Sequence, residues 1–221
     1  MFASEPKFWS EVATKYDGTV DAQLGKNLRE MIRERLSHEQ GLGETVEIGC
    51  GSGMFTGTLA GRASHVVATD IAEGMLAVAK EALRGNENVT FQIEDCQKTS
   101  FGPAVFDSAF LALVLQFVDA DAAIRELHRI LKPNGTLLIA NLDVQALTVP
   151  MRLLLIARTL CYSKVKYNRP MPRVSRKRML SSSELRTRLE SSGFRVECLE
   201  QIRDRSCAYN CPVAYVKAIR Q

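Results

Sequence analysis

Apolar and polar residues follow two spacings along the chain, and these predict strands and helices in alternation. Short apolar runs typical of buried strands occupy 45–49, 65–69, 89–93, 105–111 and 136–141. Helical spacing of apolar residues covers 8–16, 21–38, 54–62, 72–84 and 120–131. Strands separated by helices predict an α/β fold, with a mostly parallel sheet covered by helices on both faces.

The C-terminal part carries clear boundary signals. Ser181-Ser182-Ser183-Glu184 is a capping box with Ser181 as the N-cap, and the helix that it opens stops at Gly193. Residues 194–202 and 212–219 then read as two strands joined by a polar loop, which predicts a closing hairpin.

Length and composition predict a single domain over residues 1–221. The chain has the size and apolar fraction of one α/β domain. Residues 1–40 are expected to form an N-terminal helical cap. The start of the chain lacks a secretory pattern, and no apolar run approaches the ~20 residues needed to span a bilayer, so we expect a cytoplasmic protein. Six cysteines without a CxxC pair favour free thiols.

Charge is unevenly distributed. The formal net charge is +4, yet residues 151–190 hold eleven Arg and Lys against Glu184 and Glu190, which leaves −5 for the rest. The connection after residue 141 is also too long for a plain loop. Residues 143–180 are therefore interpreted as a basic, lid-like insertion, which selects an anionic acceptor or meets a membrane surface. The alternative is a core-packing helix followed by a solvated basic loop.

Candidate chemistry begins at Gly49-Cys50-Gly51-Ser52-Gly53, directly after an apolar run. Glycine lacks a Cβ, so such a loop turns sharply and brings its backbone close to a ligand. The next apolar run ends at Asp70, where a carboxylate is placed to accept hydrogen bonds from both hydroxyls of a ribose. Met54 follows the loop, so the G-x-G-x-x-G pattern of dinucleotide sites is not met.

Further motifs follow in order: Ala68-Thr69-Asp70 with Gly74-Met75-Leu76, Glu94-Asp95-Cys96, Phe106-Asp107-Ser108, and Arg129-Ile130-Leu131-Lys132-Pro133-Asn134-Gly135. With the glycine loop, they make the chain resemble the class I S-adenosylmethionine-dependent methyltransferases, especially the small branch that includes the quinone-biosynthesis enzymes. The resemblance implies a Rossmann-like, seven-stranded sheet whose last strand is antiparallel. It also implies S-adenosylmethionine as the cofactor.

The resemblance assigns the cofactor contacts residue by residue. The methionine portion would lie on Gly49, Gly51 and Gly53, with Glu47 steadying that loop and the backbone of Leu111 nearby. The adenosine portion and the sulfonium would meet the remaining set: Tyr16, Asp70, Ile71, Met75, Asp95 and Cys96. Tyr16 would close over the sulfonium and is a possible gate.

Two departures from the family pattern stand out. Asn134-Gly135 replaces Gly-Gly, a harmless change because Asn tolerates the left-handed conformation. Gln116-Phe117 stands where relatives often have a pair of His, which removes a candidate general base.

The expected activity is methyl transfer to a small, anionic or partly apolar acceptor, with proximity as the main catalytic device. His38, His65 and His128 are poorly placed as bases, so no catalytic residue is named, and no metal is expected. Anion contacts are assigned to Arg169, Arg173, Arg176 and Lys177. The acceptor atom and the oligomeric state stay open.

Three alternatives remain. The basic charge suits an RNA or protein methyltransferase, although interleaved aromatic residues are few. Cys161, Cys207 and Cys211 suggest a thiol-bound metalloid acceptor, or else ordinary thiols. A non-catalytic subunit would bind S-adenosylmethionine and transfer no methyl group.

Overall fold

A single mixed sheet organises the molecule. The computed structural model describes residues 6–24, 26–167, 179–204 and 212–221, and in this part of the chain seven strands pair in the order β3-β2-β1-β4-β5-β7-β6. Their bounds are β1 Glu44–Ile48, β2 His65–Asp70, β3 Val89–Ile93, β4 Phe106–Ala112, β5 Leu131–Leu142, β6 Phe194–Ile202 and β7 Val213–Arg220. β7 is antiparallel to both neighbours, β5 and β6, while the other pairings are parallel. The expected seven-stranded sheet with its antiparallel last strand is therefore confirmed.

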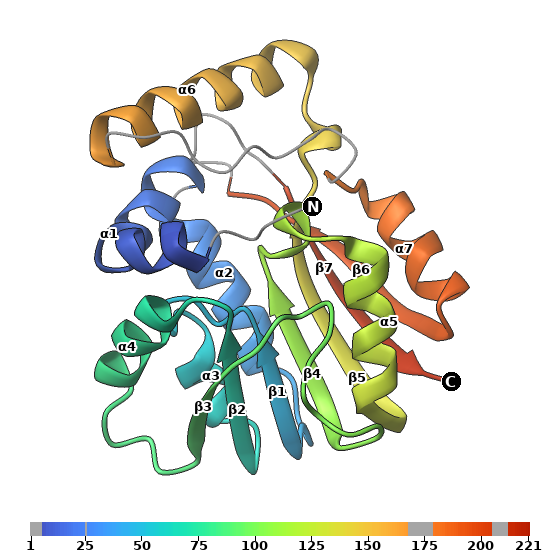
Figure 1. Cartoon of the computed structure of the whole chain (residues 1–221). Coiled ribbons are helices and arrows are strands. Elements are labelled where there is room, and N and C mark those ends of the chain that lie inside the picture. Colours follow the sequence, from blue (N-terminus) through green and yellow to red (C-terminus); the bar gives the residue numbers. More distant parts are fainter. Residues whose placement is uncertain (1–5, 25, 168–178, 205–211) are drawn as a thin grey trace.

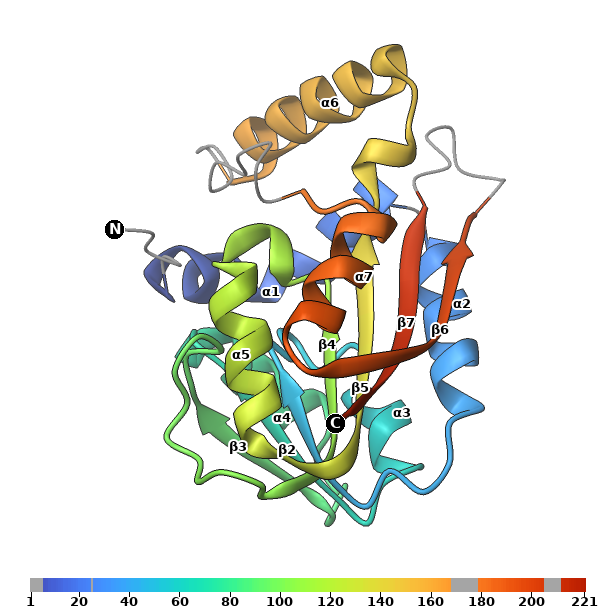
Figure 2. The same cartoon turned by 90° about the vertical axis from the view of Figure 1, so that its right-hand side faces the viewer.

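Helices cover both faces of this sheet (Figures 1 and 2). One hydrophobic cluster joins α2, α3 and α4 to the sheet, and a second joins α5 and α7 to its other face. The helix bounds are α1 Pro6–Leu24, α2 Lys26–Ser37, α3 Thr56–Ala60, α4 Glu73–Ala82, α5 Ala120–Ile130, α6 Val149–Tyr167 and α7 Ser182–Ser191, with 3-10 turns η1 Leu115–Phe117 and η2 Val144–Ala146. α1 packs on α4 and lies at the end of the sheet where β1 and β2 finish.

Strand alternation explains the two clusters. In β5, Leu138 packs on the α2 side and Leu137 and Ile139 on the α5 side, because successive side chains of a strand point to opposite faces. All three side chains are fully buried. Strands that are apolar on both faces are expected in a sheet covered by two helical layers.

Most predicted boundaries are matched within a few residues, and the exceptions are β5 and the junction of the first two helices. α1 continues to Leu24 instead of ending at residue 16, and α2 begins at Lys26 instead of residue 21. β5 begins at Leu131 instead of residue 136, since Leu131 already pairs with Phe106 and an irregularity separates that pair from the regular register. Asn134 lies inside the irregularity with a φ of 63°, the left-handed conformation that the sequence predicts for it.

The expected capping box of α7 is present. The Ser181 side chain accepts a hydrogen bond from the Glu184 backbone, and the Glu184 carboxylate accepts one from the Ser181 backbone at 2.8 Å. The closing hairpin of β6 and β7 is also present, although residues 205–211 of its connection, with Cys207 and Cys211, lie outside the described residues.

α6 lies outside the two helical layers, beyond the end of β5 (Figures 1 and 2). It is anchored by a small cluster in which Leu155 packs with Val144 and Leu147, and Met151 and Met179 border it. None of the helices in the described part of the chain has an apolar stretch long enough to cross a membrane.

Candidate functional site

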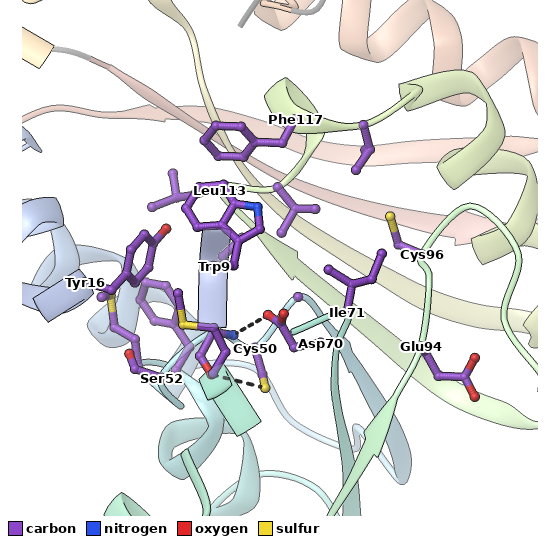
Figure 3. A pocket seen from close by; sticks show the side chains of 18 of the residues that line it. Trp9, Tyr16, Cys50, Ser52, Asp70, Ile71, Glu94, Cys96, Leu113 and Phe117 are labelled. Atoms are coloured by element: carbon purple, nitrogen blue, oxygen red, sulfur yellow. Dashed lines mark hydrogen bonds between the residues drawn. The ribbon is translucent and has the colours of Figure 1, made fainter. Parts of the chain in front are cut away.

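A cavity opens where β1, β2 and β4 end, and α1 closes one side of it. Its lining comes from the glycine loop, the residues after β2 and β3, the turn after β4, and α1 (Figure 3). Ligands of open α/β sheets bind at this edge, outside the carboxyl ends of the strands.

The glycine loop forms the floor of the cavity. Gly49, Gly51 and Gly53 have φ values of 69°, 56° and 85°, which residues with a Cβ rarely adopt. A Cβ on Gly49 would lie 2.5 Å from a methyl carbon of Val114, so the turn after β4 also requires glycine here. The loop is tied to β2 by a hydrogen bond from the Cys50 backbone to the Thr69 carbonyl oxygen at 2.8 Å.

Asp70 projects into the cavity from the end of β2 (Figure 3). Its carboxylate accepts hydrogen bonds from the backbone of Gly51 at 3.0 Å and of Ala72 at 2.9 Å. The side chain is buried, and desolvation raises its pKa above the usual value for an aspartate. Each carboxylate oxygen can accept a second hydrogen bond, so both retain capacity for a ligand.

Glu47 lies beneath the loop and does not line the cavity. It is 2% exposed, and its carboxylate accepts a hydrogen bond from the Thr56 hydroxyl at 2.5 Å. Burial, with a further contribution from the charge of Asp70, raises the pKa of Glu47 to about 7. It therefore connects the strand before the loop to the helix after it.

The acidic pair after β3 is held by local hydrogen bonds. The Asp95 carboxylate accepts from the Gln97 backbone at 2.9 Å and from the Gln97 side chain at 3.1 Å. Glu94 accepts a hydrogen bond from the Ser100 backbone at 2.8 Å. Both acids line the cavity beside Cys96, so this side of the site has a fixed carboxylate edge.

Aromatic side chains form the opposite wall. Trp9 and Tyr16 project from α1, and Phe117 comes from the turn after β4 (Figure 3). The Trp9 ring meets Tyr16 and Phe117 edge to face, with centroids 5.8 Å and 5.0 Å apart. Such pairs stabilise a rigid apolar surface.

Gly74 lets α1 come close enough to build this wall. A Cβ on Gly74 would lie 2.6 Å from the Cα of Ser10, and the Gly74 backbone donates a hydrogen bond to the Ser10 hydroxyl at 3.1 Å. The near contact involves backbone atoms, so a larger residue has to displace the helix. In the sequence, Gly74 stands out only as part of a motif. The structure adds the steric reason for glycine at this position, which is the contact with Ser10.

We expect Gly74→Ala to push α1 away from α4 and to lower the free energy of unfolding by about 1–3 kcal/mol, the usual cost of overpacking. Chemical denaturation measures this change, and the fluorescence of Trp9, the single tryptophan of the chain, reports on the wall. Gly61→Ala is the control, because its φ of −73° is open to any residue and its added Cβ would meet nothing nearer than 3.6 Å. Unchanged stability and fluorescence in Gly74→Ala would contradict the steric reason.

The cavity brings together eight of the eleven residues expected to contact a cofactor: Tyr16, Gly49, Gly51, Asp70, Ile71, Met75, Asp95 and Cys96. Glu47, Gly53 and Leu111 do not line it. A Cβ on Gly53 would face Leu83 and Ala79, so this glycine serves the packing of α4. The Leu111 side chain belongs to the cluster on the α5 side of the sheet.

The sequence missed several lining residues, of which Trp9, Leu113 and Phe117 matter most. Leu113 has a φ of 58°, an unusual conformation for a bulky residue and one that often marks functional sites. No sequence signal announces it. Trp9 is seven residues, about two helical turns, before Tyr16 on α1. This spacing places both rings on one face of the helix, so it was a usable signal for Trp9.

The three histidines lie outside the cavity. The His65 ring is 2.6 Å from the Glu44 carboxylate, the His128 ring packs on Phe194, and His38 borders a groove between α2 and β6. Among the described residues, no cluster of His, Cys, Asp and Glu is suited to hold a metal. Arg169, Arg173, Arg176 and Lys177, expected to contact an anionic acceptor, lie outside the described residues.

Parts of the chain are similar in sequence to known methyltransferases. Residues 46–139 match the family model described as a methyltransferase domain. A malonyl-[acyl-carrier protein] O-methyltransferase of Serratia marcescens is 30% identical over 140 residues, which cover 63% of this chain and 52% of that protein. A demethylmenaquinone methyltransferase of Clavibacter sepedonicus is 33% identical over 97 residues, 43% of this chain and 40% of that protein. The chain thus spans about half the length, or less, of these curated relatives.

Solved structures share the fold over nearly the whole chain. The [4+2]-cyclase SpnF superimposes with a TM-score of 0.70 at 16% identity, covering 97% of this chain and 94% of its own. Structures described as S-adenosylmethionine-dependent methyltransferases are also among the neighbours in fold. The matched family model, the relatives and the sheet topology thus agree with the resemblance of the chain to the class I S-adenosylmethionine-dependent methyltransferases that its motifs carry.

Proposed function

We propose that the chain transfers a methyl group from S-adenosylmethionine to a small, partly apolar molecule. One observation carries the proposal: a single cavity joins the glycine loop, the Asp70 carboxylate and an aromatic wall. The whole protein's activity is proposed here, because the curated relatives are matched over only part of their length.

The lining suits this cofactor. Asp70 would hold the ribose hydroxyls, Asp95 and the backbone of Cys96 would meet the adenine, and Gly49 and Gly51 would support the methionine portion. None of the described residues that line the cavity is Lys, Arg or His, so the site offers no side-chain cation for a pyrophosphate. Its carboxylates suit a cofactor that carries a positive sulfonium.

The acceptor would bind on the aromatic side. Trp9, Phe117 and Leu113 offer an apolar surface, which favours an uncharged or partly apolar reacting group. Selection of an anionic acceptor by Arg169, Arg173, Arg176 and Lys177 stays a prediction, as do the lid function of residues 143–180 and the gating function of Tyr16.

S-adenosylmethionine supplies an activated methyl group when it is bound. The residues of this chain would contribute by orienting the acceptor and excluding water. The two thiols in the lining are unsuited as bases or nucleophiles, because burial raises the pKa of Cys96 to about 12 and that of Cys50 well above its usual value. Proximity is therefore the main catalytic device that we propose.

The test has two steps. Binding of S-adenosylmethionine is followed by Trp9 fluorescence and calorimetry, and transfer is followed with cofactor labelled in the methyl group, against panels of small phenols, carboxylates and acyl thioesters. Label in a small acceptor supports the proposal. Label in RNA or protein alone supports the alternative class of methyltransferase, and binding without any transfer supports the non-catalytic subunit. Absence of cofactor binding contradicts all of them.

A further inference from the structure

α6 exposes an unusual amount of apolar surface. Six large apolar side chains are exposed in the described part of the chain, and four of them are on this helix: Val149, Leu153, Leu154 and Ile156. Their exposed fractions run from 44% to 63%. A concentration of this kind on a protein surface indicates an interaction site.

The exposed residues form a stripe on the outer side of α6. Val149, Leu153 and Ile156 are spaced i, i+4 and i+7, so they share one face of the helix, and Leu154 flanks it. Leu155, on another face, is 8% exposed and packs on the body of the protein. Figures 1 and 2 both show α6 at the periphery, with its outer side away from the sheet.

The net charge of residues 151–190, which include most of α6, selects the partner. α6 contains Arg152, Arg158, Lys164 and Lys166 and no acidic residue, and the chain outside residues 151–190 is net negative. An anionic surface would attract this side of the molecule and repel the rest, which orients the contact. A symmetric contact between two copies would instead bring the two basic segments together. RNA would use the charge and leave the apolar stripe without a partner.

We propose that α6 docks on an anionic lipid bilayer, with Val149, Leu153 and Ile156 inserted at the boundary between head groups and acyl chains. A helix that is basic, and apolar on its outer side, lies in the plane of such an interface. The proposal concerns binding alone and does not depend on methyl transfer. Because α6 contacts α1, which carries Trp9 and Tyr16, docking would bring the wall of the cavity near the membrane.

The experiment is vesicle co-sedimentation with the full chain. Vesicles of phosphatidylcholine are compared with vesicles in which about a third of the lipid is phosphatidylglycerol, at low and high salt. The test variant is Leu153→Ser with Ile156→Ser, at positions 63% and 44% exposed. The matched control is Ile93→Ser with Val105→Ser, which are 56% and 39% exposed at the end of β3 and just before β4. Thermal unfolding and gel filtration of each variant check the fold and the oligomeric state.

We expect the wild type to bind the anionic vesicles, to bind neutral vesicles weakly, and to be released by salt. The Leu153/Ile156 variant should partition at least about tenfold less, equivalent to about 1.4 kcal/mol, and the control variant should bind like the wild type. Equal binding of the wild type to neutral vesicles, or unchanged binding of the test variant, would overturn the proposal. A dimer that the test variant dissociates, or binding to RNA in the absence of vesicle binding, would overturn it as well.

Discussion

Asp70→Ala is expected to weaken S-adenosylmethionine binding by about 2–4 kcal/mol, or roughly 30-fold to 1,000-fold in Kd. Two hydrogen bonds from a ribose to a charged acceptor have about this value. The structure adds a second cause, since the same carboxylate accepts from the backbone of Gly51 and holds the loop. Fluorescence of Trp9 and calorimetry measure the change.

Asp107→Ala is the matched control for this loss. The Asp107 carboxylate accepts a hydrogen bond from the Glu44 backbone at 2.9 Å and pairs with Lys132 at 2.7 Å, at the opposite end of the sheet from the cavity. This variant therefore loses a carboxylate that also binds backbone, without touching the site. Cofactor affinity should be unchanged in Asp107→Ala, and equal affinity in both variants would refute the assignment of Asp70.

The affinity should also depend on pH. The ionised form of Asp70 accepts hydrogen bonds on both oxygens, and burial raises its pKa above the usual value for an aspartate. Protonation therefore begins at a higher pH than for an exposed aspartate. We expect cofactor binding to weaken as the pH falls through that raised pKa, and this dependence should be absent from Asp70→Ala.

Most of the fold could be predicted because local signals agree with tertiary packing. The apolar run of β4 predicts a buried strand and the sequence from Ser181 predicts a capping box, and the structure contains both features. The predicted start of β5, at residue 136, was wrong. The strand begins at Leu131, which pairs with Phe106 through backbone contacts that the pattern of side chains does not indicate. The sequence also predicted that Asn134 tolerates a left-handed conformation, because that depends on one residue alone.

The site also has one part that the sequence predicts and one part that it does not. The glycine loop and Asp70 are adjacent to strand ends, so motif order was enough to bring them together. The aromatic wall depends on how α1 packs against α4, through a hydrophobic cluster and the close approach at Gly74. The spacing of Trp9 and Tyr16 indicates that they share a face of α1, but it does not indicate that this face meets the cavity. The acceptor side is therefore the part of the site that needed a structure.

Glu47 is the second group for which we expect a large effect, on stability. Its pKa is raised to about 7 in the folded protein, against 4.5 for an ordinary glutamate, because the side chain is buried. Between these two values the folded state keeps a proton that the unfolded state releases. The free energy of unfolding should therefore fall as the pH rises from 4.5 through about 7, by about 3 kcal/mol in total.

Glu47→Gln isolates this contribution. Glutamine has nearly the same volume, and its side-chain oxygen can still accept from the Thr56 hydroxyl, but it cannot ionise. The variant should match the wild type near pH 4 and be more stable by about 2–3 kcal/mol at pH 8, measured by chemical denaturation across this range.

Glu126→Gln is expected to change the free energy of unfolding in the opposite direction. Glu126 pairs with Arg129 at 2.6 Å and accepts a hydrogen bond from the Thr99 backbone at 2.7 Å, and these contacts lower its pKa to about 2. Its stabilising contribution is lost as the pH falls, so Glu126→Gln should be less stable than the wild type at pH 8.

Parallel pH profiles for Glu47→Gln and the wild type would mean that Glu47 is already ionised in the folded protein. A negative charge would then lie under the glycine loop at neutral pH, close to the Asp70 carboxylate.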